Sequence, residues 1–400
     1  MDISQFILRK LTLDDLDQYN DLYRYAFQVT EATLLESGWE NEEIKRSKYP
    51  VLERADVWGF FDGNTLISQI AAYPLAINIH SVIYPIAFIT SVSTYPEYSG
   101  IGLMSKLMIK SLTEMRESKQ SLALLYPYSI PLYRKKGWEI VADKMSYNLK
   151  DTQLPKHTNT PGYVRRVPKE NVEFMNLHTQ FAMRTHGCLF RNNLAWDEYW
   201  RWDEEDTTVA IYYKQDDEPG GYMVYLIKDN ILYVKEMIYL DFESKKGLWN
   251  FISAHESMIN EVKGFNYFSE PIAFDLEDSA IKESIRPYIM GRIVDVEQFF
   301  EKYPFRPNLS ESFTFNISDP ILEWNNKSFT FEISHGKAKI INTPSKHQLT
   351  LSIGTLTTMM IGYKRVSDLV ELERIKTDPD TIQLLEQLIQ YKKPYISDYI

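Results

Sequence analysis

The spacing of hydrophobic residues along residues 1–150 changes repeatedly between the period of a strand and the period of a helix. Apolar side chains at every second position predict half-buried strands, and apolar side chains three and four residues apart predict amphipathic helices. The predicted elements are, in order, an extended run at 6–11, a helix at 16–27 after a capping Thr12, a hairpin at 57–67, strands at 70–79 and 84–94, a helix at 103–115, a strand at 121–125, and a last strand entered through 133–138. This order predicts an α/β unit built on a mixed sheet.

A second segment repeats this order after a polar linker at 151–162 that contains two prolines. Its predicted elements are a strand at 165–167, a helix at 172–183, and hairpin turns at 215–221 and 229–230. Residues 92–103 also align without a gap with residues 237–248, and serine, glycine and leucine coincide where the turn enters the helix. We interpret the second segment as a duplicate of the first.

The pattern changes again near Gly291, where short alternating segments replace the longer elements. The predicted elements are strands at 312–317, 321–324, 328–333, 337–341 and 349–353, followed by helices at 355–361, 366–373 and 380–390. Strands followed by helices are typical of an α+β domain. The sequence therefore predicts domains at 1–150, 151–290 and 291–400.

Composition limits the kind of protein that these elements build. The 400 residues, 44% of them hydrophobic, suffice for two or three domains with sizeable cores. A formal net charge of −11 argues against a surface that binds nucleic acid through phosphate contacts. No apolar run approaches the roughly 20 residues of a membrane helix, and the single cysteine, Cys188, excludes an intramolecular disulfide and a cysteine-based zinc site. We expect a cytoplasmic protein that binds neither a metal nor a membrane.

A glycine-containing turn, Pro96-Glu97-Tyr98-Ser99-Gly100-Ile101-Gly102, joins a predicted strand to a predicted helix. Two glycines allow the backbone to approach a ligand closely, and amides at the start of a helix attract an anion. The spacing matches neither the P-loop nor the Rossmann pattern. The turn is therefore a candidate site for a pyrophosphate, with an ordinary strand-to-helix connection as the alternative.

This turn resembles the acyl-CoA motif of the GCN5-related N-acetyltransferase (GNAT) superfamily, which reads Arg/Gln-x-x-Gly-x-Gly/Ala. Pro96, Glu97, Tyr98, Gly100 and Gly102 match the common form of the motif, whereas Ser99 replaces its arginine and Met104 its last small residue. A later signature of the superfamily resembles Tyr133-Arg134-Lys135-Lys136-Gly137-Trp138. The resemblance implies an acetyl-CoA site formed by Val92, Ser93, Thr94, Gly100, Ile101, Gly102, Leu103, Met104, Ser105, Tyr128 and Ser129.

The whole chain is similar to the enhanced intracellular survival (Eis) family of GNAT proteins. That family joins a catalytic GNAT domain, a degenerate second GNAT domain and a C-terminal domain of sterol-carrier-protein type, and it assembles as hexamers. The resemblance implies tandem mixed-sheet GNAT domains followed by an α+β domain, within a homo-oligomer. The second copy fits a degenerate domain because Asp241 replaces Pro96 and Lys245 replaces Gly100.

The family's chemistry is transfer of an acetyl group to an amine. An aliphatic ammonium has a pKa of about 10.4 and must lose a proton before it attacks the thioester. The resemblance implies that Tyr133 is the general acid that protonates the departing thiolate. It also implies that the terminal carboxylate of Ile400 is the base, although such a group has a pKa of only about 3.5 unless burial raises it. The alternatives are a tyrosine that only packs over the sheet and a frayed terminus.

The acceptor that the resemblance implies is a small polycationic amine, such as an aminoglycoside or a polyamine. Phe27, Glu31, Glu36 and Trp39 follow the first helix, where the superfamily's acceptor groove lies, and suit such a cation through charge and cation–π contacts. For the glutamates, a solvated helix face is the alternative. Two other functions remain open at this point: acetylation of protein lysines or N-termini, and a non-enzymatic lipid-binding module in the third domain.

Overall fold

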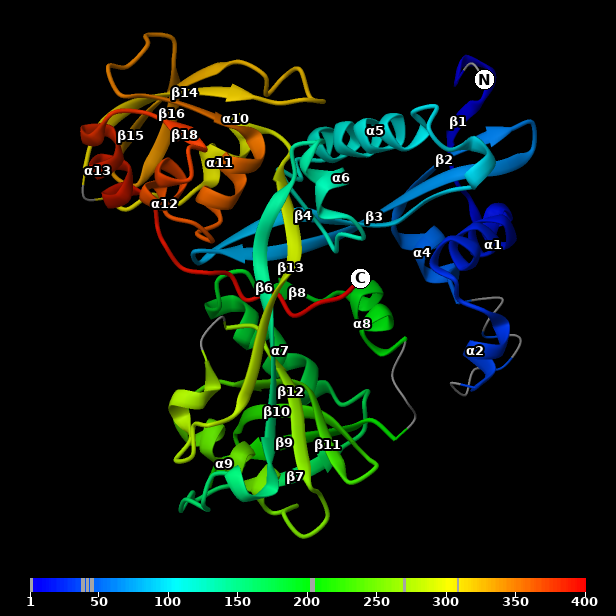
Figure 1. Ribbon diagram of the computed structural model, residues 1–400, viewed down its shortest axis with the longest axis vertical. Coiled ribbons are helices and arrows are strands. Elements are labelled where there is room, and N and C mark those ends of the chain that lie inside the picture. Colours follow the sequence, from blue (N-terminus) through cyan, green and yellow to red (C-terminus); the bar gives the residue numbers. More distant parts are fainter. Residues whose placement is uncertain are drawn as a thin grey trace.

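The computed structural model describes residues 3–36, 40, 43, 47–201, 206–268, 271–307 and 309–400. These residues form two β-sheets, one of 13 strands and one of five. We call the parts that carry β1–β6, β7–β13 and β14–β18 the first, second and third domains. Figure 1 shows the first domain at the right, the second at the bottom and the third at the upper left. The expected mixed α/β architecture with a separate α+β domain is confirmed.

The first domain follows the hydrophobic pattern closely. Its elements are β1 (Ile7–Lys10), α1 (Leu16–Phe27), α2 (Glu31–Glu36), α4 (Tyr49–Arg54), β2 (Asp56–Asp62), β3 (Thr65–Ile79), β4 (Val82–Thr94), α5 (Leu103–Glu117), β5 (Leu122–Leu125), α6 (Ile130–Arg134) and β6 (Glu139–Lys150). Thr12 begins a short 3-10 turn that leads into α1, and its amide donates to the Asp15 carboxylate at 2.8 Å. The sequence pattern predicts neither α2 nor α4, which are only six residues long.

The second domain repeats this order. Its elements are β7 (Tyr163–Val167), α7 (Val172–Arg184), β8 (Leu189–Phe190), α8 (Asn193–Trp200), β9 (Thr208–Tyr213), β10 (Pro219–Lys228), β11 (Ile231–Tyr239), α9 (Phe242–Ser253), β12 (Glu261–Asn266) and β13 (Lys282–Ile293). The turn predicted at 215–221 is shorter, because the Lys214 amide donates to the Glu218 carbonyl at 2.9 Å and Pro219 already pairs with Tyr213. The turn at 229–230 is confirmed.

The third domain contains the small sheet and the C-terminal helices, which are orange to red in Figure 1. Its elements are α10 (Val296–Lys302), β14 (Glu311–Ser318), β15 (Ser328–Ser334), β16 (Lys337–Ile341), β17 (Gln348–Ser352), α11 (Ile353–Met360), α12 (Val366–Glu371), β18 (Ile375–Lys376) and α13 (Pro379–Leu388). The strand predicted at 321–324 is wrong. The Asp319 carboxylate accepts hydrogen bonds from the amides of Ile321 and Leu322, which bends the chain into a turn.

Two long strands, β6 and β13, cross between the first and second domains (Figure 1). The end of β13, residues 290–293, pairs with β5 and so lies between β5 and β6 in the first domain. The end of β6, residues 145–150, pairs with β12 and so lies between β12 and β13 in the second domain. Each domain therefore completes its part of the sheet with a strand from the other, and the large sheet is continuous.

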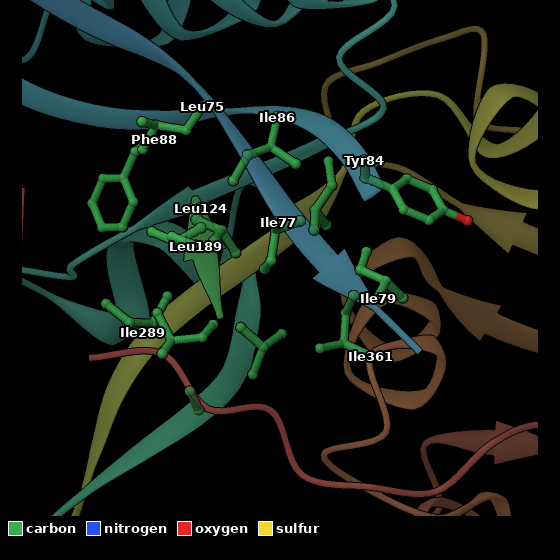
Figure 2. Close-up of a cluster of buried hydrophobic side chains, with 14 of the residues drawn as sticks. Leu75, Ile77, Ile79, Tyr84, Ile86, Phe88, Leu124, Leu189, Ile289 and Ile361 are labelled. Carbon is green, nitrogen blue, oxygen red and sulfur yellow. The ribbon is translucent and has the colours of Figure 1, made fainter. Parts of the chain in front are cut away.

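A core of buried apolar side chains joins the three domains (Figure 2). Ile77 of β3, Leu189 of β8 and Ile361 after α11 belong to one cluster and are at most 1% exposed. The apolar side chains of α11, which a lipid cavity of the third domain would need, are packed in the same cluster: Leu356, Met359 and Met360. They serve as core in this structure.

None of the helices in the described ranges is both long and apolar enough to cross a membrane.

Candidate active site

The parallel ladder between β4 and β5 ends before β4 does. The strands pair over residues 86–89 and 122–125, whereas β4 continues to Thr94. A bulge with Ser91 at a φ of 54° twists β4 where the pairing stops, and the Ser91 hydroxyl accepts a hydrogen bond from Tyr19 at 2.7 Å. We call this region the β4–β5 fork. On its open side, no strand of the described chain pairs with β4 beyond Ile89, which leaves backbone groups available to a ligand.

The turn after β4 holds amides at the fork. Gly100 and Gly102 have φ angles of 80° and 94°, and α5 begins directly afterwards at Leu103. These angles favour glycine, and a Cβ on either residue would meet no atom within 4 Å. The amides in the first turn of a helix have no intrahelical acceptor, so those from Leu103 to Ser105 can bind a ligand at the positive end of the helix dipole. The turn can therefore hold an anion.

Lys136 places a cation at this helix start, and the sequence interpretation missed it. Its ammonium lies 2.6 Å from the hydroxyl of Ser105 in the first turn of α5. The side chain is half-buried, and burial lowers its pKa. A charged group that is partly desolvated beside a neutral hydroxyl gains from a nearby anion. Lys136 therefore supplies charge to the turn in which Ser99 replaces the usual arginine.

The other predicted contacts of β4 offer backbone rather than side chains. The Ser93 hydroxyl donates to the Ser91 carbonyl at 3.1 Å, and the Thr94 hydroxyl shares a hydrogen bond of 2.7 Å with the Ser68 hydroxyl. The Val92 side chain packs toward the core under α5. The side chains at these positions are already engaged, so a ligand in the fork meets the backbone of β4.

Tyr133 lies in α6, the short helix that follows β5. It is 6% exposed and packs in the cluster under α5, edge-on to Trp138 with 6.2 Å between ring centroids. Its hydroxyl makes no hydrogen bond to any described residue, and burial raises its pKa to about 12. Before α6, Tyr128 is 92% exposed and Ser129 is half-buried. The Tyr133 hydroxyl is thus protonated and available as a donor.

The C-terminal segment, residues 389–400, leaves the third domain and passes between the other two as the red trace of Figure 1. The Asp398 carboxylate accepts a hydrogen bond from Arg191 at 2.6 Å, and the Ser397 hydroxyl donates to Glu236 at 2.7 Å. Tyr399 then packs against Tyr126, the residue after β5, with ring centroids 5.0 Å apart. The segment is anchored, and its end reaches the fork.

Tyr133 and Ile400 lie on opposite faces of the sheet. Tyr133 belongs to the core cluster under α5, whereas Ile400 is half-buried against the cluster that contains α1 and α7 residues. No hydrogen bond or ring contact joins these two described residues. The β4–β5 fork lies between the two faces, so a reacting group in the fork is accessible from both sides.

Of the four residues predicted to bind the acceptor, three lie within the described residues. Phe27 ends α1, is 42% exposed, and packs on Tyr23 with 4.8 Å between ring centroids. Glu31 and Glu36 are the first and last residues of α2, and Trp39 lies outside the described residues.

The second domain has no equivalent of the glycine turn. The residues that align with it, Phe242–Gly247, are already helical in α9. The Asp241 carboxylate caps this helix by accepting from the Ser244 amide at 2.8 Å, and it pairs with Lys214 at 3.0 Å. The Asp241 carboxylate therefore occupies the position at the start of α9 where the phosphate of a ligand would bind.

No three His, Cys, Asp or Glu side chains within the described ranges are grouped so that they could hold a metal ion.

Comparisons with known protein families divide the chain into three matches. Residues 8–141 match one family described as an acetyltransferase (GNAT) domain, and residues 187–293 match a second family with the same description. Residues 296–397 match a sterol carrier protein domain.

Relatives with similar sequence or structure span nearly the whole chain. An uncharacterized N-acetyltransferase from Streptomyces griseus is 19% identical over 372 residues, which cover 85% of this chain and 88% of the relative. A crystal structure from Enterococcus faecalis, a probable N-acyltransferase, superposes with a TM-score of 0.90 at 28% identity and covers 99% of this chain and 100% of its own. The crystal structure of Eis1 from Mycobacterium abscessus has the same fold, with a TM-score of 0.81 at 16% identity over 98% of this chain and 100% of its own.

Proposed function

We propose that this chain, which has the Eis-like architecture of two GNAT domains and a sterol carrier protein domain, transfers an acetyl group from acetyl-CoA to an amine at the β4–β5 fork. The observation that carries the proposal is the fork itself. Unpaired β4 backbone, the amides after Gly100 and Gly102, and the Lys136 ammonium all lie where β4 leads into α5. The chain is a homologue of GNAT N-acetyltransferases, and the acceptor and the site residues are our proposals.

The residues at the fork suit both the pyrophosphate and the pantetheine arm of acetyl-CoA. Amides from Gly100 to Ser105 and the Lys136 ammonium would hold the pyrophosphate, since both supply positive charge at a helix start. The backbone of Val92, Ser93 and Thr94 would hold the pantetheine arm, because amide groups of that arm can continue the ladder that β5 leaves. When bound, acetyl-CoA supplies the thioester as electrophile.

Tyr133 and Ile400 are the groups we propose for proton transfer. Tyr133 would donate a hydrogen bond or a proton to the departing thiolate, because its hydroxyl makes no other hydrogen bond to the described residues and its pKa is raised to about 12. The carboxylate of Ile400, on the other face of the sheet, would accept the proton from the amine, as the family resemblance implies. The half-buried position of Ile400 supports this role, because partial desolvation strengthens a carboxylate base.

The acceptor we propose is a small cationic amine, an aminoglycoside or a polyamine. The exposed Phe27 and its neighbour Tyr23 offer ring faces to an ammonium group at the end of α1. The formal charge of −11 favours the approach of cations. We further propose, on the family resemblance, a hexamer in the cytoplasm. We also propose that the second domain does not bind acetyl-CoA, since Asp241 caps its helix start.

The experiment is an acetylation assay with a panel of acceptors. The purified protein is incubated with acetyl-CoA and an aminoglycoside, a polyamine, a lysine peptide or no acceptor, and both CoA release and the acetylated product are measured. We expect product with the soluble amines and a fall in kcat of about 100-fold or more for Tyr133→Phe. Acetylation of the peptide alone would replace the proposed acceptor with a protein lysine. Failure of acetyl-CoA to bind would contradict the proposed function itself.

A further inference from the structure

A cavity of about 680 Å³ lies on the sheet of the second domain, beside the C-terminal segment. Its walls include Lys144 of β6, Lys235 of β11 and Tyr288 of β13, and Ser397 and Tyr399 close one end. None of the described residues that line it belongs to β4, β5 or α5. The cavity therefore lies outside the β4–β5 fork but next to it, because Tyr399 lines the cavity and also packs on Tyr126 after β5. We call it the Lys144 pocket.

The ammonium group of Lys144 is surrounded by aromatic rings. It lies 3.5 Å from the centroid of the Phe265 ring, 5.2 Å from that of Tyr288 and 5.5 Å from that of Tyr267. No carboxylate of the described chain pairs with it. Cation–π contacts contribute about 0.5–2 kcal/mol, whereas burying an unpaired charge costs several kcal/mol, so the rings alone do not compensate for desolvation.

Neighbouring charges make this position more cationic. Burial, followed by the positive charges of Arg286 and Lys235, lowers the pKa of the Lys144 ammonium to about 8. Lys235 also lines the pocket, where its ammonium donates to the Tyr199 carbonyl at 2.6 Å. Lys144 and Lys235 thus line the same cavity, and the positive charge of Lys235 raises the energy of the charged form of Lys144.

The two glutamates in the pocket wall do not neutralise Lys144, because both carboxylates are held by other cations. Glu198 pairs with Lys48 at 3.2 Å and with Arg201 at 2.9 Å. Glu236 pairs with Arg191 at 2.8 Å. The cavity therefore combines an apolar aromatic wall with the Lys144 ammonium, which no carboxylate of the described residues neutralises and which attracts an anion.

We propose that the Lys144 pocket binds a small organic anion with a flat apolar body, such as an aromatic carboxylate. The carboxylate would pair with the Lys144 ammonium, and the ring would lie among Phe265, Tyr267 and Tyr288. The volume suits this class, since pockets for small molecules range over about 300–1,000 Å³ and combine apolar walls with few polar groups. The walls are accessible from solvent, because Phe265 is 37% exposed and Tyr399 is 54% exposed. This site does not depend on the proposed acetyl transfer.

Calorimetric titration with three probes of similar shape tests the proposal: naphthoate, naphthylmethanol and naphthylmethylamine. We expect naphthoate to bind at least tenfold more tightly than either of the others. Lys144→Met should weaken naphthoate at least tenfold, whereas Lys144→Arg, which keeps the charge, should retain most of the affinity. Lys263→Gln is the matched control, because Lys263 also lines the pocket but pairs with Glu261 at 2.9 Å, and it should change affinity less than twofold.

A second control separates this pocket from the glycine turn, which also attracts anions. Naphthoate affinity should be the same in Lys136→Ala and in the presence of saturating acetyl-CoA. Three results would overturn the proposal: no naphthoate binding, binding of the amine as tight as that of the acid, or unchanged affinity in Lys144→Met. If the methionine variant does not fold, the affinities of the unchanged protein for naphthoate, naphthylmethanol and naphthylmethylamine still decide the proposal, because the three probes differ in charge and share one shape.

Discussion

The Arg191 guanidinium and the Asp398 carboxylate meet at 2.6 Å with almost no solvent exposure, at 0% and 3% of the respective side chains. One residue belongs to the second domain and the other stands near the end of the chain. Arg191 also donates to both oxygens of Glu236, so two acids share one cation. Burial raises the pKa of Asp398 in spite of Arg191. The pair fixes the path of the C-terminal segment.

Asp398→Ala should release this segment without unfolding the protein, because Arg191 keeps Glu236 as its partner. We expect a loss of about 2 kcal/mol in the free energy of unfolding, less than the roughly 3–5 kcal/mol for a buried pair whose remaining charge is left alone, and a fall of at least tenfold in kcat with unchanged affinity for acetyl-CoA. Denaturant titration and steady-state kinetics measure both. Glu332→Ala, on an exposed position of β15, is the control. Wild-type kcat in Asp398→Ala would argue against a role for the anchored segment.

Lys136→Ala should weaken acetyl-CoA binding by about 10- to 100-fold, since a charge-assisted hydrogen bond contributes about 1.5–3 kcal/mol. The KM for the acceptor should stay the same. Ser99→Arg, introduced into the Lys136→Ala variant, should recover part of the affinity, because it restores a cation to the turn. The exposed Lys135→Ala is the matched control. Equal dissociation constants for the Lys136→Ala and Lys135→Ala variants would show that Lys136 does not serve the phosphates.

Two glycines with similar backbone angles should respond differently to alanine. Gly137 has a φ of 81°, and a Cβ there would overlap the Arg292 guanidinium and the Ile353 side chain, so Gly137→Ala should lose about 3 kcal/mol or more of stability. Gly102 has open space at its Cβ position, so Gly102→Ala should lose only the roughly 1–2 kcal/mol of backbone strain. Acetyl-CoA titration should show weaker binding in Gly102→Ala. A stable Gly137→Ala would contradict the packing described for Arg292.

Glu198 should give the protein a stability that depends on acid pH. Burial raises its pKa, but Lys48 and Arg201 outweigh that effect and lower the pKa to about 2. A depressed carboxylate pKa stabilises the fold above about pH 4.5, and this contribution is lost as the pH falls toward 2. Glu198→Gln should therefore cost about 3 kcal/mol at pH 7 and much less at pH 3 in denaturant titrations. Glu297→Gln, which removes an exposed pair with Lys327, should show no such trend.

The sequence predicts the elements of this fold well where one face of an element is apolar. The helices at α5 and α7 and the strands β3 and β4 follow directly from spacing. The strand predicted at 321–324 is wrong because its apolar residues insert into the neighbouring core: Leu322 packs in the cluster under α5, and the Trp324 indole donates to the Val294 carbonyl at 2.8 Å. The spacing of apolar residues predicts where strands lie but not which strands pair. The exchange of β6 and β13 between the domains could therefore not be predicted from the sequence.

The sequence also predicts only part of the candidate active site. The glycine turn is visible in the sequence because positive φ angles require glycine there, at Gly100 and Gly102. Lys136 and Arg191 escape notice because their partners are distant in the chain: Ser105 is 31 residues from Lys136, and Asp398 is 207 residues from Arg191. From the sequence alone, a lysine or arginine is expected to be exposed to solvent. Only the structure shows which residue its charged group contacts.

Because β6 and β13 are exchanged, the first domain cannot complete its sheet until most of the second domain has been synthesised. The first domain lacks its interior strand until residue 293 has been made, because β13 must enter between β5 and β6. At 5–20 residues per second, the ribosome needs roughly 7 to 30 seconds to proceed from the end of β6 to the end of β13. Throughout that interval the nascent chain carries an unpaired edge on β5. We expect this edge to be a site at which the nascent chain pairs with other chains and aggregates.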